Sequence, residues 1–209
     1  MRIFKIMVLL LFFISNLYSN QQKKLAYIVS DINIPFWQII SKGIKDKSNA
    51  MLNVIKEYES DNLKKNELEN MALALDKKID GLIISPINSS TAATLLEIAK
   101  INNIPVVIAD IGSNSKDYVS FISSDNKKGA YELGKILAKH MKNLSWNKEG
   151  TVGIISIPQK RTNGKDRTLG FIQALDEESI KVSGFYQQVD FSYEETYNYS
   201  KKLIEENKN

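Results

Sequence analysis

The chain has 209 residues, of which 43% are hydrophobic and 25% charged, which is typical of a folded soluble protein with one or two domains. It contains no cysteine and one histidine, which excludes disulfides and Cys-based zinc sites and leaves little material for a multi-His metal site or a serine-type triad. The net charge of +4 comes from lysines spread along the chain, so it indicates a solvated surface and no nucleic-acid-binding stripe.

The N-terminus has the pattern of a secretory signal peptide. Arg2 and Lys5 precede or flank the apolar run "IMVLLLFFI", which is followed by the polar "SNLYSN". The apolar run is too short for a membrane span, which needs about 20 residues. No cysteine follows it, so no lipid can be attached there. We expect residues 1–19 to be removed after Ser19, and the mature protein to be exported to the periplasm without spanning the membrane.

Short apolar runs alternate with longer mixed stretches over the rest of the chain. The predicted strands are 24–30, 53–60, 79–86, 104–110, 118–124, 151–157 and 181–189. The predicted helices are 36–50, 62–77, 89–102, 126–142, 163–178 and 193–207. Several strands are continuous apolar runs, as expected where helices cover both faces of a sheet. The rhythm predicts an α/β fold with a doubly wound, mostly parallel, Rossmann-like sheet.

The turns that follow the predicted strands carry the chemistry of the chain. Right-handed crossovers place these turns along one edge of the sheet, where open α/β sheets bind ligands. They are rich in Ser, Asn, Asp, Lys and Arg and include two aromatics, a mixture that suits a small polar ligand. GxGxxG, HExxH and GxSxG motifs are absent from the sequence, so we predict neither an enzyme nor a cofactor. His140 is interpreted as a favourable cation in the last turn of a helix.

Several of these segments, in order, resemble the periplasmic type I solute-binding proteins, in particular the ribose-, galactose- and autoinducer-2-binding group. They are "AYIVSDINIPFWQIISKGI", "DGLIISPINSS", "IPVVIADIGS", "FISSDNKKGAYELGKIL" and "GFIQAL". The resemblance implies an N-terminal lobe over 20–124 and part of a C-terminal lobe over 125–209. It also implies capture of a monosaccharide or similar polyol between the lobes for an ABC-type importer, with an inner-membrane permease as partner.

A sensory role is the alternative, in which the closed form binds a chemoreceptor or the ectodomain of a sensor kinase. Repressors that share this fold would carry a helix-turn-helix where this chain has its apolar N-terminus. No nucleic acid partner is therefore expected.

The resemblance also implies the ligand-binding residues. They are Ser30, Phe36, Trp37, Ser85, Asp110, Lys165, Arg167 and Phe191. Aromatic rings would cover the C–H faces of a sugar, while charged groups bond its hydroxyls. Simpler roles stay open for some of them: one aromatic could belong to the core, Asp110 could cap a turn, and Arg167 could form a surface ion pair. Ser123 and Ser124 could cap the next helix.

The chain departs from the family pattern at three positions and in length. Ile34 and Ser85 stand where the ribose-binding pattern has Asn, and Ile111 stands where it has Arg. Because unpaired buried polar groups are costly, a site with fewer polar groups favours a ligand that is less hydroxylated than ribose or differently shaped. The family continues with further second-lobe strands, so we expect an incomplete second lobe. A fragment, a truncated gene product or a partner that supplies the missing sheet would each explain it.

Overall fold

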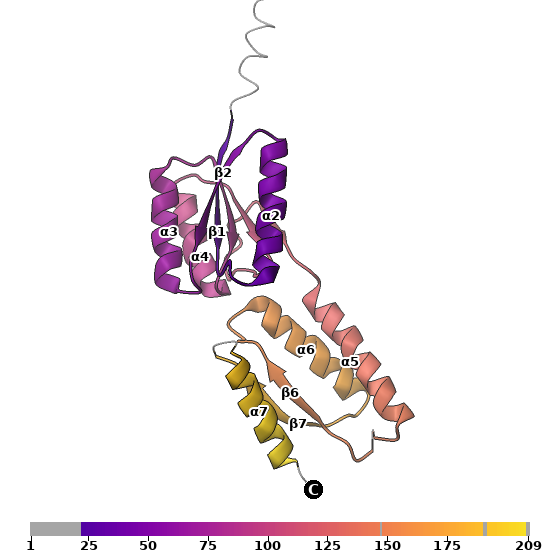
Figure 1. Cartoon of the computed structure of the whole chain (residues 1–209). Coiled ribbons are helices and arrows are strands. Elements are labelled where there is room, and N and C mark those ends of the chain that lie inside the picture. Colours follow the sequence, from indigo (N-terminus) through magenta and orange to yellow (C-terminus); the bar gives the residue numbers. More distant parts are fainter. Residues whose placement is uncertain (1–21, 147, 190–191, 208–209) are drawn as a thin grey trace, which may run out of the picture.

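Strands and helices alternate along the chain in the computed structural model, which describes residues 22–146, 148–189 and 192–207 (Figure 1). The first part contains β1 (Lys24–Val29), α2 (Pro35–Ala50), β2 (Val54–Glu59), α3 (Lys64–Asp76), β3 (Gly81–Ser85), α4 (Ser89–Ile101), β4 (Val106–Ala109) and β5 (Ser120–Ile122). The second part contains α5 (Asn126–Asn143), β6 (Val152–Ser156), α6 (Thr162–Glu177), β7 (Val182–Gln187) and α7 (Tyr193–Glu206). We call these parts the first and second lobes.

The first lobe is built on a five-stranded parallel sheet with the order β2-β1-β3-β4-β5. Side chains alternate between its faces, as they must along a strand. Ala26 and Ile28 pack with α3 and α4 on one face, while Tyr27 and Val29 pack with α2 on the other. Figure 1 shows α2 on the opposite side of the sheet from α3 and α4. The predicted doubly wound parallel sheet is confirmed.

The second lobe contains a two-stranded parallel sheet, β6 with β7, among the described residues. Helices α5 and α6 pack side by side, and a Cβ on Gly170 would lie only 2.0 Å from the carbonyl oxygen of Lys127. Leu203 of α7 lies over Gly153 and Gly184, so α7 covers the strands where they carry no side chain. This small sheet matches the expectation of a partial second lobe.

Every strand and helix predicted within the described residues is present, but each of the strands is shorter than predicted. The segment 104–110 forms a strand only over Val106–Ala109, because Pro105 has no N–H to donate and Asp110 has a left-handed backbone with φ of 69°. The segment 118–124 pairs only over Ser120–Ile122. His140 lies in the last turn of α5, as predicted.

Two predictions concern export: a signal peptide at the N-terminus and a mature chain that does not span the membrane. The signal peptide over residues 1–19 lies outside the described residues, so it stays a prediction. Among the helices that the structure describes, none is both long and apolar enough to cross a lipid bilayer.

Candidate functional site

The site lies where the carboxyl ends of the first-lobe strands meet the turn that precedes α6. Ser30 follows β1, Ser85 ends β3 and Asp110 follows β4, so parallel strands bring the three residues to one edge. The backbone N–H of Ser30 donates to the carbonyl of Ser85 at 3.0 Å, which ties the first two strand ends together. In Figure 1 the start of α6 lies against this end of the first lobe.

The two aromatics at the start of α2 have different environments. Pro35 occupies the first turn of the helix, where its missing N–H is tolerated. Phe36 is 49% exposed, whereas Trp37 is 4% exposed and packs with Tyr27 in the core. The rings of Phe36 and Trp37 meet edge to face, with centroids 4.8 Å apart at 71°. Phe36 therefore offers an accessible ring, and Trp37 supports it from the core.

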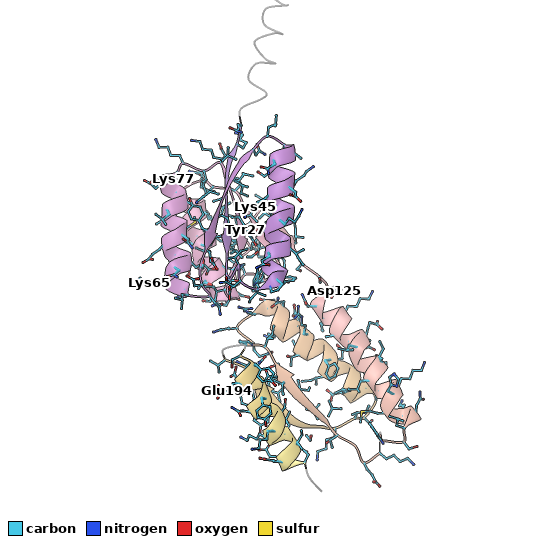
Figure 2. All side chains as sticks on the ribbon, viewed as in Figure 1. Tyr27, Lys45, Lys65, Lys77, Asp125 and Glu194 are labelled. Atoms are coloured by element: carbon cyan, nitrogen blue, oxygen red, sulfur yellow. The ribbon has the colours of Figure 1, made fainter. Side chains whose placement is uncertain are left out.

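The serines at the ends of β1 and β3 are buried beneath the site. The Ser85 hydroxyl is hydrogen-bonded to the Tyr27 hydroxyl at 2.9 Å. Burial raises the pKa of Tyr27 to about 12; the bond to Ser85 opposes this shift, while Glu57 and Asp110 add to it. Figure 2 labels Tyr27, which lies inside the first lobe. The Ser30 hydroxyl oxygen is buried and has no hydrogen-bond partner among the described residues.

Asp110 joins the two lobes. Its carboxylate accepts a hydrogen bond of 2.9 Å from the side-chain amide of Asn163, in the first turn of α6. Burial raises the pKa of Asp110, while the guanidinium groups of Arg167 and Arg161 and the bond from Asn163 oppose that shift. Asn163 is 6% exposed, and its Oδ1 atom has no partner among the described residues. The site thus pairs one carboxylate with donors from the opposite lobe and leaves a buried acceptor nearby.

The basic turn contributes one of its two predicted residues and one that was not predicted. Lys165 and Arg167 are both exposed, and the basic side chains whose charge lowers the pKa of Asp110 are those of Arg167 and of Arg161, which was not predicted. Arg167 also donates to Asn126 at 2.7 Å. Sequence reasoning missed Arg161 and Asn163, although both lie in the turn that it singled out. The sequence did not show how the first turn of α6 is oriented, and that orientation determines which side chains of the turn face the first lobe.

Phe191, Ser123 and Ser124 are the remaining residues that the sequence singled out. Phe191 lies outside the described residues, so its role stays a prediction. The cap of α5 is Asp125, labelled in Figure 2, whose carboxylate accepts from the backbone N–H of Lys128 at 3.0 Å. Ser123 and Ser124 line a hollow of about 480 Å³ between α2 and the face of the sheet formed by β3, β4 and β5, together with Phe36 and Asp110.

The described residues offer little for a metal centre. Among them, no group of three or more His, Cys, Asp or Glu side chains could hold a metal ion.

A second hollow, of about 550 Å³, lies in the second lobe between α5, α6 and β6 and includes Arg167 and Thr168. The arrangement at the strand ends is suited to hydrogen-bonding a polar molecule between the lobes.

Comparison with known proteins places the chain in a family. Residues 25–209 match the periplasmic binding protein domain. The chain is 27% identical over 188 residues to the ribose import binding protein of Haemophilus influenzae, covering 89% of this chain and 62% of that relative. It is 22% identical over 187 residues to the HTH-type transcriptional repressor PurR of Edwardsiella ictaluri, covering 88% of this chain and 52% of that relative.

Solved structures share the fold. A carbohydrate transporter solute-binding protein from Agrobacterium radiobacter, in complex with D-arabinose, superposes with a TM-score of 0.80 at 22% identity; the match covers 90% of this chain and 65% of that one. The chain therefore spans less than two thirds of the length of these relatives. With the domain matched from the first strand onward, the chain belongs to the periplasmic binding protein family, type I fold.

Proposed function

We propose that the mature protein captures a small sugar-like ligand between its two lobes and presents it to an ABC-type importer. The observation that carries this proposal is the setting of Asp110, which lines a hollow with Phe36 of the first lobe, accepts a hydrogen bond from Asn163 of the second lobe and is influenced by the charge of Arg167. The printed name of the Haemophilus relative, a ribose import binding protein, agrees with it.

The chemistry of these groups suits a polyol. The exposed ring of Phe36 can cover a patch of C–H bonds, which is the apolar face of a sugar. The Asp110 carboxylate accepts hydrogen bonds from hydroxyls, and charged acceptors bind more strongly than neutral ones. Arg167 supplies donors from the second lobe. No bond needs to be made or broken, so the proposal is a binding protein and not an enzyme.

The departures from the ribose-binding pattern narrow the ligand class. The Ser85 hydroxyl is bonded to Tyr27, Ile111 is fully buried in the core, and Ile34 is 44% exposed at the entrance to α2. None of these side chains offers the amide or guanidinium of the ribose-binding pattern. We therefore expect a ligand with fewer hydroxyls than ribose, or a different arrangement of them.

The cellular setting belongs to the same proposal. Removal of residues 1–19 would release the mature chain into the periplasm, with residues 20–124 and 125–209 acting as the two lobes. The partner would be an inner-membrane permease. In the alternative, the closed form would bind a chemoreceptor or sensor-kinase ectodomain, and the neighbouring genes would separate the two roles.

Isothermal titration of the exported chain against a panel of pentoses, hexoses and inositols tests the proposal. We expect one or more of these ligands to bind, and Phe36→Ala to weaken that binding. Phe185→Ala is the matched control, because Phe185 is 42% exposed on β7, on the second-lobe sheet. A panel without any heat or thermal shift, measured on folded protein, contradicts the proposal.

A further inference from the structure

Arg161 of the second lobe reaches into the first lobe. It directly precedes α6, and its Nε–H donates to the carbonyl oxygen of Ile87 at 2.9 Å. Its terminal nitrogen donates to Oδ1 of Asn62 at 3.3 Å. Ile87 follows β3 and Asn62 follows β2, so one side chain contacts the turns after two different strands.

The first lobe holds the receiving peptide group in place with a buried carboxylate. Glu67 of α3 is fully buried, and its Oε1 accepts from the backbone N–H of Ile87 at 2.8 Å. The N–H of Ile87 is therefore fixed by Glu67, while the carbonyl of the same residue receives Arg161. Burial raises the pKa of Glu67, and the positive charge of Arg161 is among the influences that oppose this shift.

The residues on either side of Arg161 continue the contact. The hydroxyl oxygens of Thr162 and Ser89 are 2.6 Å apart, and the backbone N–H of Thr162 donates to the Ser89 hydroxyl at 3.0 Å. The N–H of Ser89 donates in turn to the carbonyl of Lys160 at 3.3 Å. The next residue in the chain is Asn163, which bonds Asp110.

We propose that Arg161 is a positioning residue of the interlobe site. By docking the turn before α6 on Ile87, it holds Asn163 and Arg167 against Asp110 before any ligand arrives. Its value for ligand capture rests on the function proposed above, whereas the docking itself can be measured without a ligand. Removal of Arg161 lowers the population in which the lobes are closed, and thereby weakens binding without removing a ligand contact.

A cysteine pair can report the closed population, because the chain has no cysteine of its own. Ser89→Cys and Thr162→Cys replace the two hydroxyls that lie 2.6 Å apart, so a disulfide can form when the lobes are docked. The rate of cross-linking under a mild oxidant is measured without ligand by non-reducing electrophoresis. Each single-cysteine variant controls for bonds between molecules.

The cross-linking rate is then compared after Arg161→Gln and after Lys160→Gln. The second variant is the matched control: it removes the same charge from the same turn, and Lys160 contributes to the contact through its backbone carbonyl. We expect Arg161→Gln to slow cross-linking roughly tenfold, because it removes a charge-assisted bond, and Lys160→Gln to leave the rate unchanged. Glu67→Gln keeps an acceptor for Ile87 and removes the charge near Arg161, so it is expected to slow cross-linking as well.

Equal rates for the Arg161→Gln and Lys160→Gln backgrounds overturn the proposal, as does a folded cysteine pair that never cross-links. Should Arg161→Gln fail to fold, the Glu67→Gln rate decides in its place. The sugar titration is read separately: a chain that binds no sugar but cross-links as expected contradicts the proposed function and leaves the docking by Arg161 supported. A chain that binds sugar equally well with and without Arg161 contradicts only the positioning role.

Discussion

Asp110→Asn separates the role of the carboxylate charge from its role in the backbone. Asn has nearly the same size as Asp and, like Asp, tolerates the left-handed conformation found here, with φ of 69°. The substitution therefore keeps the end of β4 in place. It removes the negative charge that faces Arg167 and Arg161.

The expected effects on stability and binding have opposite signs. Burial raises the pKa of Asp110, so ionisation of this carboxyl destabilises the folded lobe. The protonated carboxyl leaves the stability of the folded lobe at its full value below the pKa of an ordinary aspartic acid, and this stability is lost as the pH rises through the higher pKa of the folded state. An asparagine side chain does not ionise, so the Asp110→Asn variant does not lose this stability. The first lobe should thus be as stable as wild type or more stable at pH 7. Ligand binding should weaken about fivefold, since a charged acceptor contributes roughly 1 kcal/mol more than a neutral one.

Urea unfolding followed by tryptophan fluorescence measures the first lobe alone after one replacement. The chain has two tryptophans: Trp37 is buried in the first lobe, and Trp146 is 60% exposed in the second. In a Trp146→Phe background, the signal comes from Trp37. Asp110→Ala is the control, because it also removes the charge but places a residue with a Cβ and no compensating polar group in the left-handed region, at about 1 kcal/mol.

The reasoning fails if Asn and Ala variants unfold at the same urea concentration, both below wild type, at pH 4 and at pH 7. That outcome would mean that the carboxylate stabilises the lobe through its contacts and that burial of the charge is unimportant. Unchanged ligand affinity in the Asn variant would remove Asp110 from the binding site.

Three further predictions test other parts of the structure. Gly170→Ala should destabilise the second lobe by about 1–3 kcal/mol, because its methyl group would lie 2.0 Å from a backbone carbonyl of α5. Gly129→Ala should stabilise the lobe by up to about 1 kcal/mol, because its methyl group would have nothing within 4 Å. Urea unfolding of the two variants compares these effects. Tyr27→Phe should flatten the loss of stability between pH 10 and about 12, where the wild type loses up to about 2.7 kcal/mol as the raised pKa of the phenol is passed; equal alkaline slopes would contradict this. Phe36→Ala should lower the affinity for ligand with little effect on the free energy of unfolding, and Trp37→Ala should lower the free energy of unfolding by about 3–5 kcal/mol; the reverse pattern would exchange their roles.

The order of strands and helices could be predicted because it depends on local patterns. Short, continuous apolar runs such as 81–85 are typical of strands in a sheet covered on both faces. The helices between them carry apolar residues on one side. Strand ends were less predictable. Asp110 ends β4 through a left-handed backbone that its residue type permits but does not require.

The site was predictable only where it depends on strand ends. Asp110 and Phe36 follow strands, so the topology alone brings them to the same edge of the sheet. The division of labour between Phe36 and Trp37 depends on the rotation of α2 about its axis, which two adjacent aromatics do not reveal. Arg161 and Asn163 depend on how the second lobe is placed against the first, and no local pattern encodes that placement.

The close packing of α5 on α6 means that a small rotation where the chain passes between the lobes moves both helices together. Helix α5 starts immediately after the segment that leaves β5, and at Gly170 its backbone touches α6 too closely for the helices to slide past each other. The start of α6 projects about 12 Å beyond that contact. A rotation of about 10° at the connection would swing this tip by about 2 Å, enough to separate Asn163 from Asp110. The two helices are therefore expected to move as one rigid unit. A small change in the backbone torsion angles near Ser124 would then open or close the site.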